Sequence, residues 1–107
     1  MDRYEYKLKT EQIQKLIARK EYKAALQIVE TLDWRKEKDV RILSAAAEVY
    51  VANKQYSDAI DLLVQAYELA PIGRRVIYRL TEVAILAGET EAAESYLEEF
   101  REVAPGD

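Results

Sequence analysis

The chain has no cysteine and no histidine among its 107 residues. Without cysteine there can be no disulfide, no thiolate nucleophile and no zinc–sulfur site. Without histidine the commonest general base and the commonest transition-metal ligand are also missing. Carboxylates remain as ligands for hard cations, but no Asp-rich loop has the EF-hand spacing. We therefore predict a protein that is not an enzyme and that holds no metal and no cofactor.

Glycine and proline are scarce, with three Gly and two Pro in the whole chain. This leaves few residues for the turns of an all-β fold. Half of the residues are hydrophobic and 34% are charged, as in ordinary globular proteins. Ala, Leu, Glu, Lys, Arg and Gln are abundant, and all of them favour helices. The composition predicts a single all-α domain over residues 1–107.

No hydrophobic run approaches the roughly 20 residues of a membrane span, and the polar N-terminus has no signal-peptide core. These features predict a cytoplasmic protein with no membrane partner. The net charge is −4 but uneven, because residues 1–41 carry 11 Lys and Arg against 8 Asp and Glu. Residues 42–107 carry 5 against 12. Since phosphate contacts need a basic surface, we expect no nucleic-acid partner.

Hydrophobic residues recur at helical spacing in six segments. The segments are 3–19, 22–32, 40–53, 56–70, 74–87 and 90–103. Ser57 or Asp58 is predicted to cap the fourth helix and Thr90 the sixth, while Gly88 follows the fifth. Ile85 is predicted to face inward. Trp34, in the charged connector 33–39, is predicted to cover the end of a helix pair, because Trp buries a large area and seeks one polar partner.

Residues 40–71 are the most regular part of the chain. Alanines stand where two helices would touch, at Ala46, Ala47, Ala59 and Ala66. Pro71 is predicted to stop the second helix of this pair. A shift of 34 residues superimposes Pro71 on Pro105 and aligns Ala25, Ala59 and Ala93. A fixed period with helix–turn–helix content is typical of a solenoid, in which stacked helix pairs bury a continuous core.

These residues resemble the tetratricopeptide repeat family, through the repeat length and the pattern Ala47, Tyr50, Ala59, Ala66 and Pro71. The resemblance implies a right-handed α-solenoid of three antiparallel helix pairs, with repeats at about 6–39, 40–73 and 74–107. Several positions depart from the family pattern. Thr81 and Phe100 replace small residues, Glu37 stands in place of the proline, and Lys9 and Gln12 replace apolar residues.

In proteins of this family the first helix of each pair lines a curved groove where partner segments bind. In this chain those helices would be 3–19, 40–53 and 74–87. Residues at i, i+3 and i+7 share a helix face. The groove residues predicted in this way are Lys7 and Gln14 with Thr10 between them, then Arg41, Ser44 and Glu48, then Arg75, Tyr78 and Glu82, together with Arg79.

Arg41 and Arg75 lie in the first turns of their predicted helices, where the dipole disfavours a cation by about 0.3–1 kcal/mol. Arg75 and Arg79 are also like charges at i, i+4. An acidic partner segment would stabilise this arrangement, because its carboxylates could form charge-assisted hydrogen bonds with the arginines at the helix N-terminus. The alternative is that these arginines pair with nearby carboxylates such as Glu68 or Glu82. Thr10, Gln14 and Ala45 stand where chaperone-tail clamps have Lys and two Asn, so we do not predict chaperone-tail binding.

The sequence therefore predicts a noncatalytic scaffold that binds a protein or peptide segment, with an acidic segment as one candidate partner. One alternative is a structural module that self-associates through its terminal helix pair, which includes a homodimer. A less favoured alternative is binding of single-stranded RNA, because related helical repeats read RNA. Tyr96, Phe100 and Val103 would need a cover, so we expect the chain to be the N-terminal part of a longer protein.

Overall fold

The computed structural model describes residues 2–70 and 74–103, and within these ranges all regular structure is helical. The α-helices are α1 (Arg3–Ala18), α2 (Tyr22–Val29), α3 (Val40–Ala52), α4 (Tyr56–Leu69), α5 (Arg74–Leu86) and α6 (Thr90–Val103). A short 3₁₀ helix, η1 (Trp34–Lys36), lies between α2 and α3. Pro71 and Pro105 lie outside the described residues, so the predicted helix stop at Pro71 stays a prediction.

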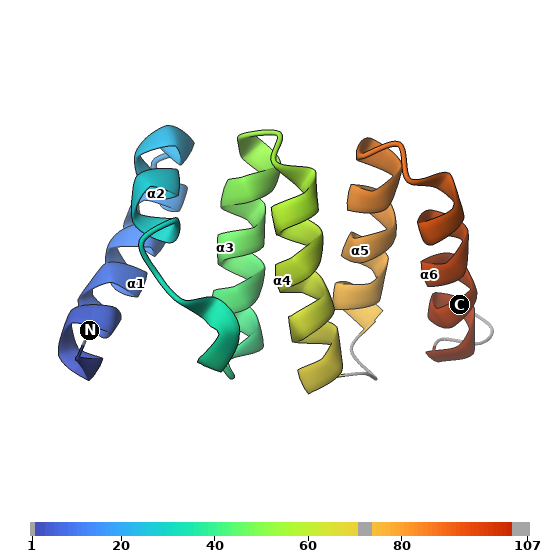
Figure 1. The fold of residues 1–107 in the computed structure, drawn as a ribbon, viewed down its shortest axis with the longest axis horizontal. Helices are drawn as coiled ribbons and strands as arrows, with labels where there is room; N and C mark the ends of the chain where they lie inside the picture. The colour runs from blue at the N-terminus through green and yellow to red at the C-terminus, as the bar shows by residue number, and fades with distance from the viewer. Residues whose placement is uncertain (1, 71–73, 104–107) are drawn as a thin grey trace.

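The helices stand in a row as three antiparallel pairs, α1 with α2, α3 with α4 and α5 with α6 (Figure 1). Each pair packs against the next through α2 with α3 and α4 with α5. The resulting body is elongated, measuring 42 × 24 × 21 Å. The predicted all-α helical-repeat solenoid is confirmed.

One continuous core runs through the row, from Ile13 in α1 to Val83 in α5. The four alanines predicted at close helix contacts are all buried, with at most 1% of their surface exposed. Large side chains fill the space around them, with Leu43, Leu63 and Leu80 almost fully buried. This supports the packing reason for the repeat, because a small residue is needed wherever two helices of fixed geometry approach closely.

The three turns within the pairs share one backbone geometry, and they are spaced by 34 residues. Lys20, Lys54 and Gly88 have φ angles of 60°, 60° and 78°. Each donates its N–H to the carbonyl three residues earlier, and the next N–H reaches five residues back, as in Gln55 to Tyr50 at 2.9 Å. This is the Schellman ending, in which a left-handed residue satisfies the last carbonyls of a helix. From the sequence, this ending was predicted at Gly88 only, because glycine favours a positive φ angle and lysine does not.

Because the left-handed region is strained for a residue with a Cβ, we expect opposite effects at equivalent turns. Lys54→Gly should raise the free energy of unfolding by about 0.5–1 kcal/mol. Gly88→Ala should lower it by about 1 kcal/mol, although a Cβ at Gly88 would meet nothing within 4 Å. Urea unfolding followed by circular dichroism would measure both. Lys36→Gly, outside these turns, is the control for loss of a lysine. Equal signs at residues 54 and 88 would contradict the strain argument.

Two predicted N-cap residues are wrong, although both helices begin at the predicted residues 56 and 90. Helix α4 begins at Tyr56, and the N-cap residue Gln55 makes no side-chain capping bond, so Ser57 and Asp58 lie in the first turn. Helix α6 begins at Thr90, which is therefore not the cap. The reason is the same in both pairs. The left-handed residue reverses the chain so tightly that the next helix starts two residues later, and the polar residue that looked like a cap already lies inside the helix.

Helix α2 ends at Val29, three residues before the predicted end. Two side chains that follow the helix satisfy its last carbonyls. The Thr31 hydroxyl donates to the Ile28 carbonyl at 2.7 Å, and the Trp34 indole Nε1–H donates to the Val29 carbonyl at 3.0 Å. These bonds compete with a further helical turn. Trp34 is buried, so its predicted role as the cover of a helix end is confirmed.

Candidate functional site

A pocket of about 490 Å³ lies between α3 and α5, two of the predicted groove helices. Its apolar lining comes from Val40, Ala45, Leu63 and Val76. Its polar lining is Arg41, Ser44, Glu48, Arg75 and Arg79, all of which the sequence analysis had selected. Two helices from different repeats therefore bring these side chains to one opening. The repeat register explains this, because residues 34 apart occupy the same face of successive first helices.

The remaining predicted groove residues do not line this pocket. Lys7 and Gln14 are exposed on α1, and Tyr78 is exposed on α5. Glu82 is half-buried and contacts Arg79. Thr10 is buried, and its hydroxyl donates to the Lys7 carbonyl at 2.9 Å. Thr10 is therefore satisfied within its own helix and is not available to a ligand.

Arg79 joins α5 to α3 by a bidentate ion pair. Its Nε and Nη2 donate to the two carboxylate oxygens of Glu48 at 2.8 and 2.7 Å. A third bond, from Nη1, reaches Glu82 at 3.3 Å. The hydrogen bonds to Glu48 raise the pKa of Arg79 above its ordinary value, so the charge is permanent. The charge of Arg79 is therefore neutralised by Glu48 and Glu82 within the protein. Arg79 links α5 to α3 at the pocket and is not available to pair with a ligand.

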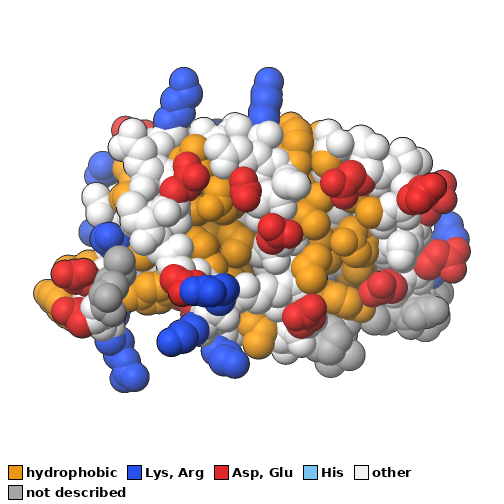
Figure 2. All heavy atoms as spheres, in the orientation of Figure 1, with side chains coloured by type: hydrophobic (Ala, Val, Ile, Leu, Met, Phe, Trp, Pro, Cys, Tyr) orange, Lys and Arg blue, Asp and Glu red, His pale blue; other side chains and the backbone are white. Residues whose placement is uncertain are grey.

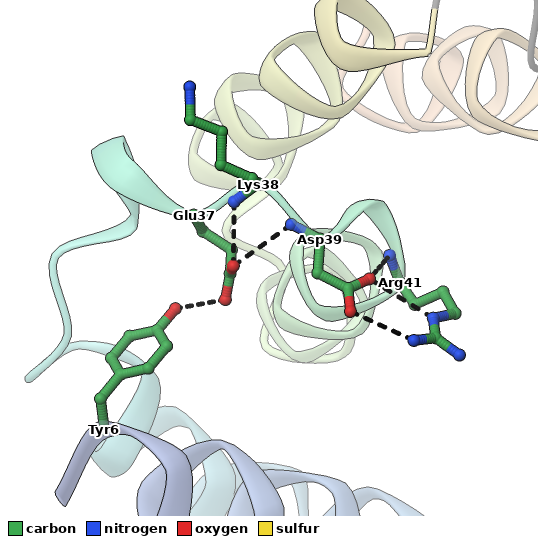
Figure 3. A network of polar contacts seen from close by, with 5 residues as sticks. All are labelled: Tyr6, Glu37, Lys38, Asp39 and Arg41. Atoms are coloured by element: carbon green, nitrogen blue, oxygen red, sulfur yellow. Dashed lines mark hydrogen bonds and ion pairs between the residues drawn. The ribbon is translucent and has the colours of Figure 1, made fainter. Parts of the chain in front are cut away.

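Arg41 is compensated by Asp39, the N-cap of α3 (Figure 3). Asp39 accepts the Arg41 backbone N–H at 2.9 Å, and its carboxylate pairs with the guanidinium at 3.2 Å. The side-chain hydrogen bond from Arg41 lowers the pKa of Asp39. The capping carboxylate thus offsets the unfavourable position of a cation in the first turn. This capping role of Asp39 was not predicted from the sequence, although an Asp directly before a helix is a common capping signal.

Arg75 differs from both of these arginines. It is exposed at the pocket rim, and within residues 2–70 and 74–103 it forms no ion pair. It lies in the first turn of α5, where the helix dipole adds positive potential. Among the three arginines of the pocket, Arg75 is therefore the one that can form an ion pair with an acidic group of a ligand.

A second cavity, of about 650 Å³, lies where the N-terminal end of α1 meets the connector before α3. Within it Glu37 accepts a hydrogen bond from the Tyr6 hydroxyl (Figure 3). Glu37 also accepts the backbone N–H groups of Lys38, at 2.9 Å, and Asp39, at 3.2 Å. Burial, and then the bond to Glu37, raise the pKa of Tyr6. Glu37 thus fixes the entry to α3 and ties it to α1 at the position where the family pattern has proline.

Charge is distributed unevenly over the surface. In Figure 2 most of the Lys and Arg side chains in view lie in the half nearer the N-terminus, while Asp and Glu dominate toward the C-terminal end. Within the described ranges no group of His, Cys, Asp or Glu could hold a metal ion. Among these residues, no helix is both long enough and hydrophobic enough to span a bilayer.

Residues 50–107 match the protein-family profile described as "Tetratricopeptide repeat". A search of curated proteins finds no significant match. Among solved structures, the Yersinia enterocolitica type III secretion chaperone SycD, in complex with a peptide of the translocator YopD, is similar over 99% of this chain and 81% of its own, with a TM-score of 0.76 and 18% identity. PcrH, in complex with the chaperone binding region of PopB, is similar over 100% and 86%, with a TM-score of 0.75 and 14% identity.

The Sgt2 TPR domain from Aspergillus fumigatus is similar over 95% of this chain and 68% of its own, with a TM-score of 0.72 and 20% identity. At these identities the likeness concerns the fold. The profile match covers more than half of the chain and includes α4, α5 and α6 in full.

Proposed function

Because the chain belongs to the tetratricopeptide repeat family, we propose that it is a noncatalytic scaffold whose groove, at the pocket between α3 and α5, binds a segment of another protein. The observation that carries this proposal is the pocket itself. It combines an apolar lining with one uncompensated cation, Arg75, at the rim. The peptide complexes of SycD and PcrH support the proposal, since their chains share this fold.

The partner proposed for the pocket is a peptide with a hydrophobic side chain next to an acidic one. Val40 and Ala45, which are half-buried, offer the hydrophobic side chain an apolar surface next to the more deeply buried Leu63 and Val76. A carboxylate beside it would meet Arg75, while Glu48 and Glu82 keep Arg79 occupied. The acidic C-terminal two-thirds of the chain would repel phosphates, so the proposal includes no nucleic acid. A cytoplasmic location and a place at the N-terminal end of a longer protein remain predictions from the sequence.

The proposal predicts that a short peptide of alternating Leu and Asp binds better than its Leu and Lys counterpart. Arg75→Glu should weaken binding of the acidic peptide by about tenfold to a hundredfold, the equivalent of one charge-assisted hydrogen bond. Titration calorimetry at low salt would measure this. Arg101→Glu is the matched control, because it makes the same charge change on α6, where Arg101 is 69% exposed.

Unchanged affinity in Arg75→Glu, or equal loss in Arg75→Glu and Arg101→Glu, would count against the pocket. Equal binding of the acidic and basic peptides would count against the acidic partner. An RNA that shifts with the wild-type chain at low salt, and competes with the peptide, would favour the RNA alternative instead.

A further inference from the structure

The two ends of the helix row present faces that would be buried in the middle of a longer stack. At the C-terminal end, Leu97 of α6 is 40% exposed, whereas Leu63, its equivalent one repeat earlier, is 1% exposed. Ile85 of α5 is 63% exposed, while its equivalent Val51 packs against the core. The predicted inward orientation of Ile85 is therefore wrong, and the reason is that no further described helix covers α5 and α6.

The N-terminal end shows the same difference. Leu8 of α1 is 47% exposed, whereas its equivalent Val76 in α5 is 7% exposed. Lys15 is exposed, although Val49 and Val83, at the same repeat position, are fully buried. A hollow of about 490 Å³ lies on this face, and its lining residues are Leu8, Glu11, Gln12, Lys15, Leu16 and Arg19. Here too the exposed residues occupy positions that a neighbouring helix pair covers elsewhere.

The charges at the two end faces have opposite signs. On the N-terminal face, Lys15 and Arg19 are both exposed. On the C-terminal face, Glu94 and Glu98 are both exposed, at positions where α4 has Ile60 and Val64 packed against the core. Each face thus combines an exposed hydrophobic residue with two charges of one sign and one opposite charge, which is Glu11 on the N-terminal face and Arg101, paired with Glu98, on the C-terminal face. The uneven charge of the sequence therefore gives the N-terminal end of the row an excess of positive charge and the C-terminal end an excess of negative charge.

We propose that the C-terminal face of one copy of this chain docks on the N-terminal face of a second copy. Helix α1 of the second copy would take the place on α5 and α6 that α5 takes on α3 and α4. Opposite charges would then face each other around Leu8, Ile85 and Leu97. A tail-to-tail dimer would instead bring Glu94 and Glu98 of both copies together, and such like-charge contacts are unfavourable.

This contact is heterologous, since each copy uses two different faces. One face of every docked copy stays open, so the assembly grows linearly and does not stop at a dimer. Because charges contribute to docking, we expect the association constant to fall at least about tenfold between about 0.01 M and about 1 M salt. The docking uses neither Arg75 nor the pocket between α3 and α5, so it is independent of the proposed peptide binding.

Sedimentation velocity over a wide concentration range tests this proposal with two variants. The head variant is Lys15→Glu with Arg19→Glu, and the tail variant is Ile85→Glu with Leu97→Glu. Each variant alone should stay monomeric, and circular dichroism melting shows whether each one is folded. An equimolar mixture should form a 1:1 dimer and nothing larger, because only one wild-type head and one wild-type tail can meet. Lys36→Glu with Lys54→Glu makes the same charge change as the head variant away from both faces, and should associate as the wild type does.

A wild-type chain that is monomeric at every concentration at low salt would overturn the proposal. A head variant that associates as strongly as the wild type would also overturn it, in favour of a tail-to-tail dimer. If the tail variant does not fold, Ile85→Glu alone replaces it, since this side chain is mostly exposed. Neither a positive nor a negative result for self-association affects the peptide-binding test with Arg75→Glu, because the two sites do not overlap.

Discussion

Trp34→Ala is expected to lower the free energy of unfolding by about 3–5 kcal/mol, the usual cost of removing a buried large aromatic side chain. Trp34 is 8% exposed although it lies in a connector of charged residues. Its ring meets Tyr6 edge to face, with the ring centroids 6.3 Å apart. Its backbone carbonyl accepts a bond from the Gln65 amide at 2.6 Å. Trp34 therefore holds α1, α2 and α4 around one connector.

The indole N–H contributes separately from the ring volume. It satisfies the Val29 carbonyl at the end of α2. Trp34→Phe keeps most of the apolar area and removes this bond, while the Leu32 N–H still donates to the Val29 carbonyl at 3.3 Å, so we expect a smaller loss of about 0.5–1.5 kcal/mol. Urea unfolding followed by circular dichroism would measure both variants. Similar losses for Ala and Phe would mean that the hydrogen bond, and not the packing, dominates. A loss below about 1 kcal/mol for Ala would contradict the burial argument.

The second large effect is a difference between two leucines at the same repeat position. Leu63→Ala should cost about 2–5 kcal/mol, because Leu63 is 1% exposed and its removal leaves a cavity between α4 and α5. Leu97→Ala should cost only about 1 kcal/mol, because Leu97 is already 40% exposed and its surroundings can relax. The same unfolding measurement at low protein concentration compares them without self-association.

Each of these leucines serves as the control for the other, since the substitution, the helix position and the repeat register are the same. Equal losses at residues 63 and 97 would show that the C-terminal face is covered in solution. If the losses become equal only at high protein concentration, a second copy supplies that cover, as the docking proposal requires. If they are equal at every concentration, the exposure of Leu97 does not describe the chain in solution.

The sequence by itself determined the fold class and the selection of the pocket residues. Helical periodicity and a 34-residue register depend only on residue spacing, because every repeat presents the same face to its neighbour. The same register identified Arg41, Ser44, Glu48, Arg75 and Arg79 as residues of one groove, and all five line the pocket. The buried alanines were predictable for the same reason, since close helix contacts admit only small side chains.

Only the tertiary structure decided which charged side chains of the pocket already have a partner within the protein. The ion pair of Arg79 with Glu48 joins residues 31 apart, and the bond of Tyr6 to Glu37 also spans 31 residues. Neither pairing follows from spacing on one helix, because each depends on how two helix pairs stack. The exposure of Ile85 likewise depends on which helices lie beside it. A repeat pattern describes what equivalent positions have in common. Ion pairing and burial, in contrast, depend on the residues that surround each repeat within the chain.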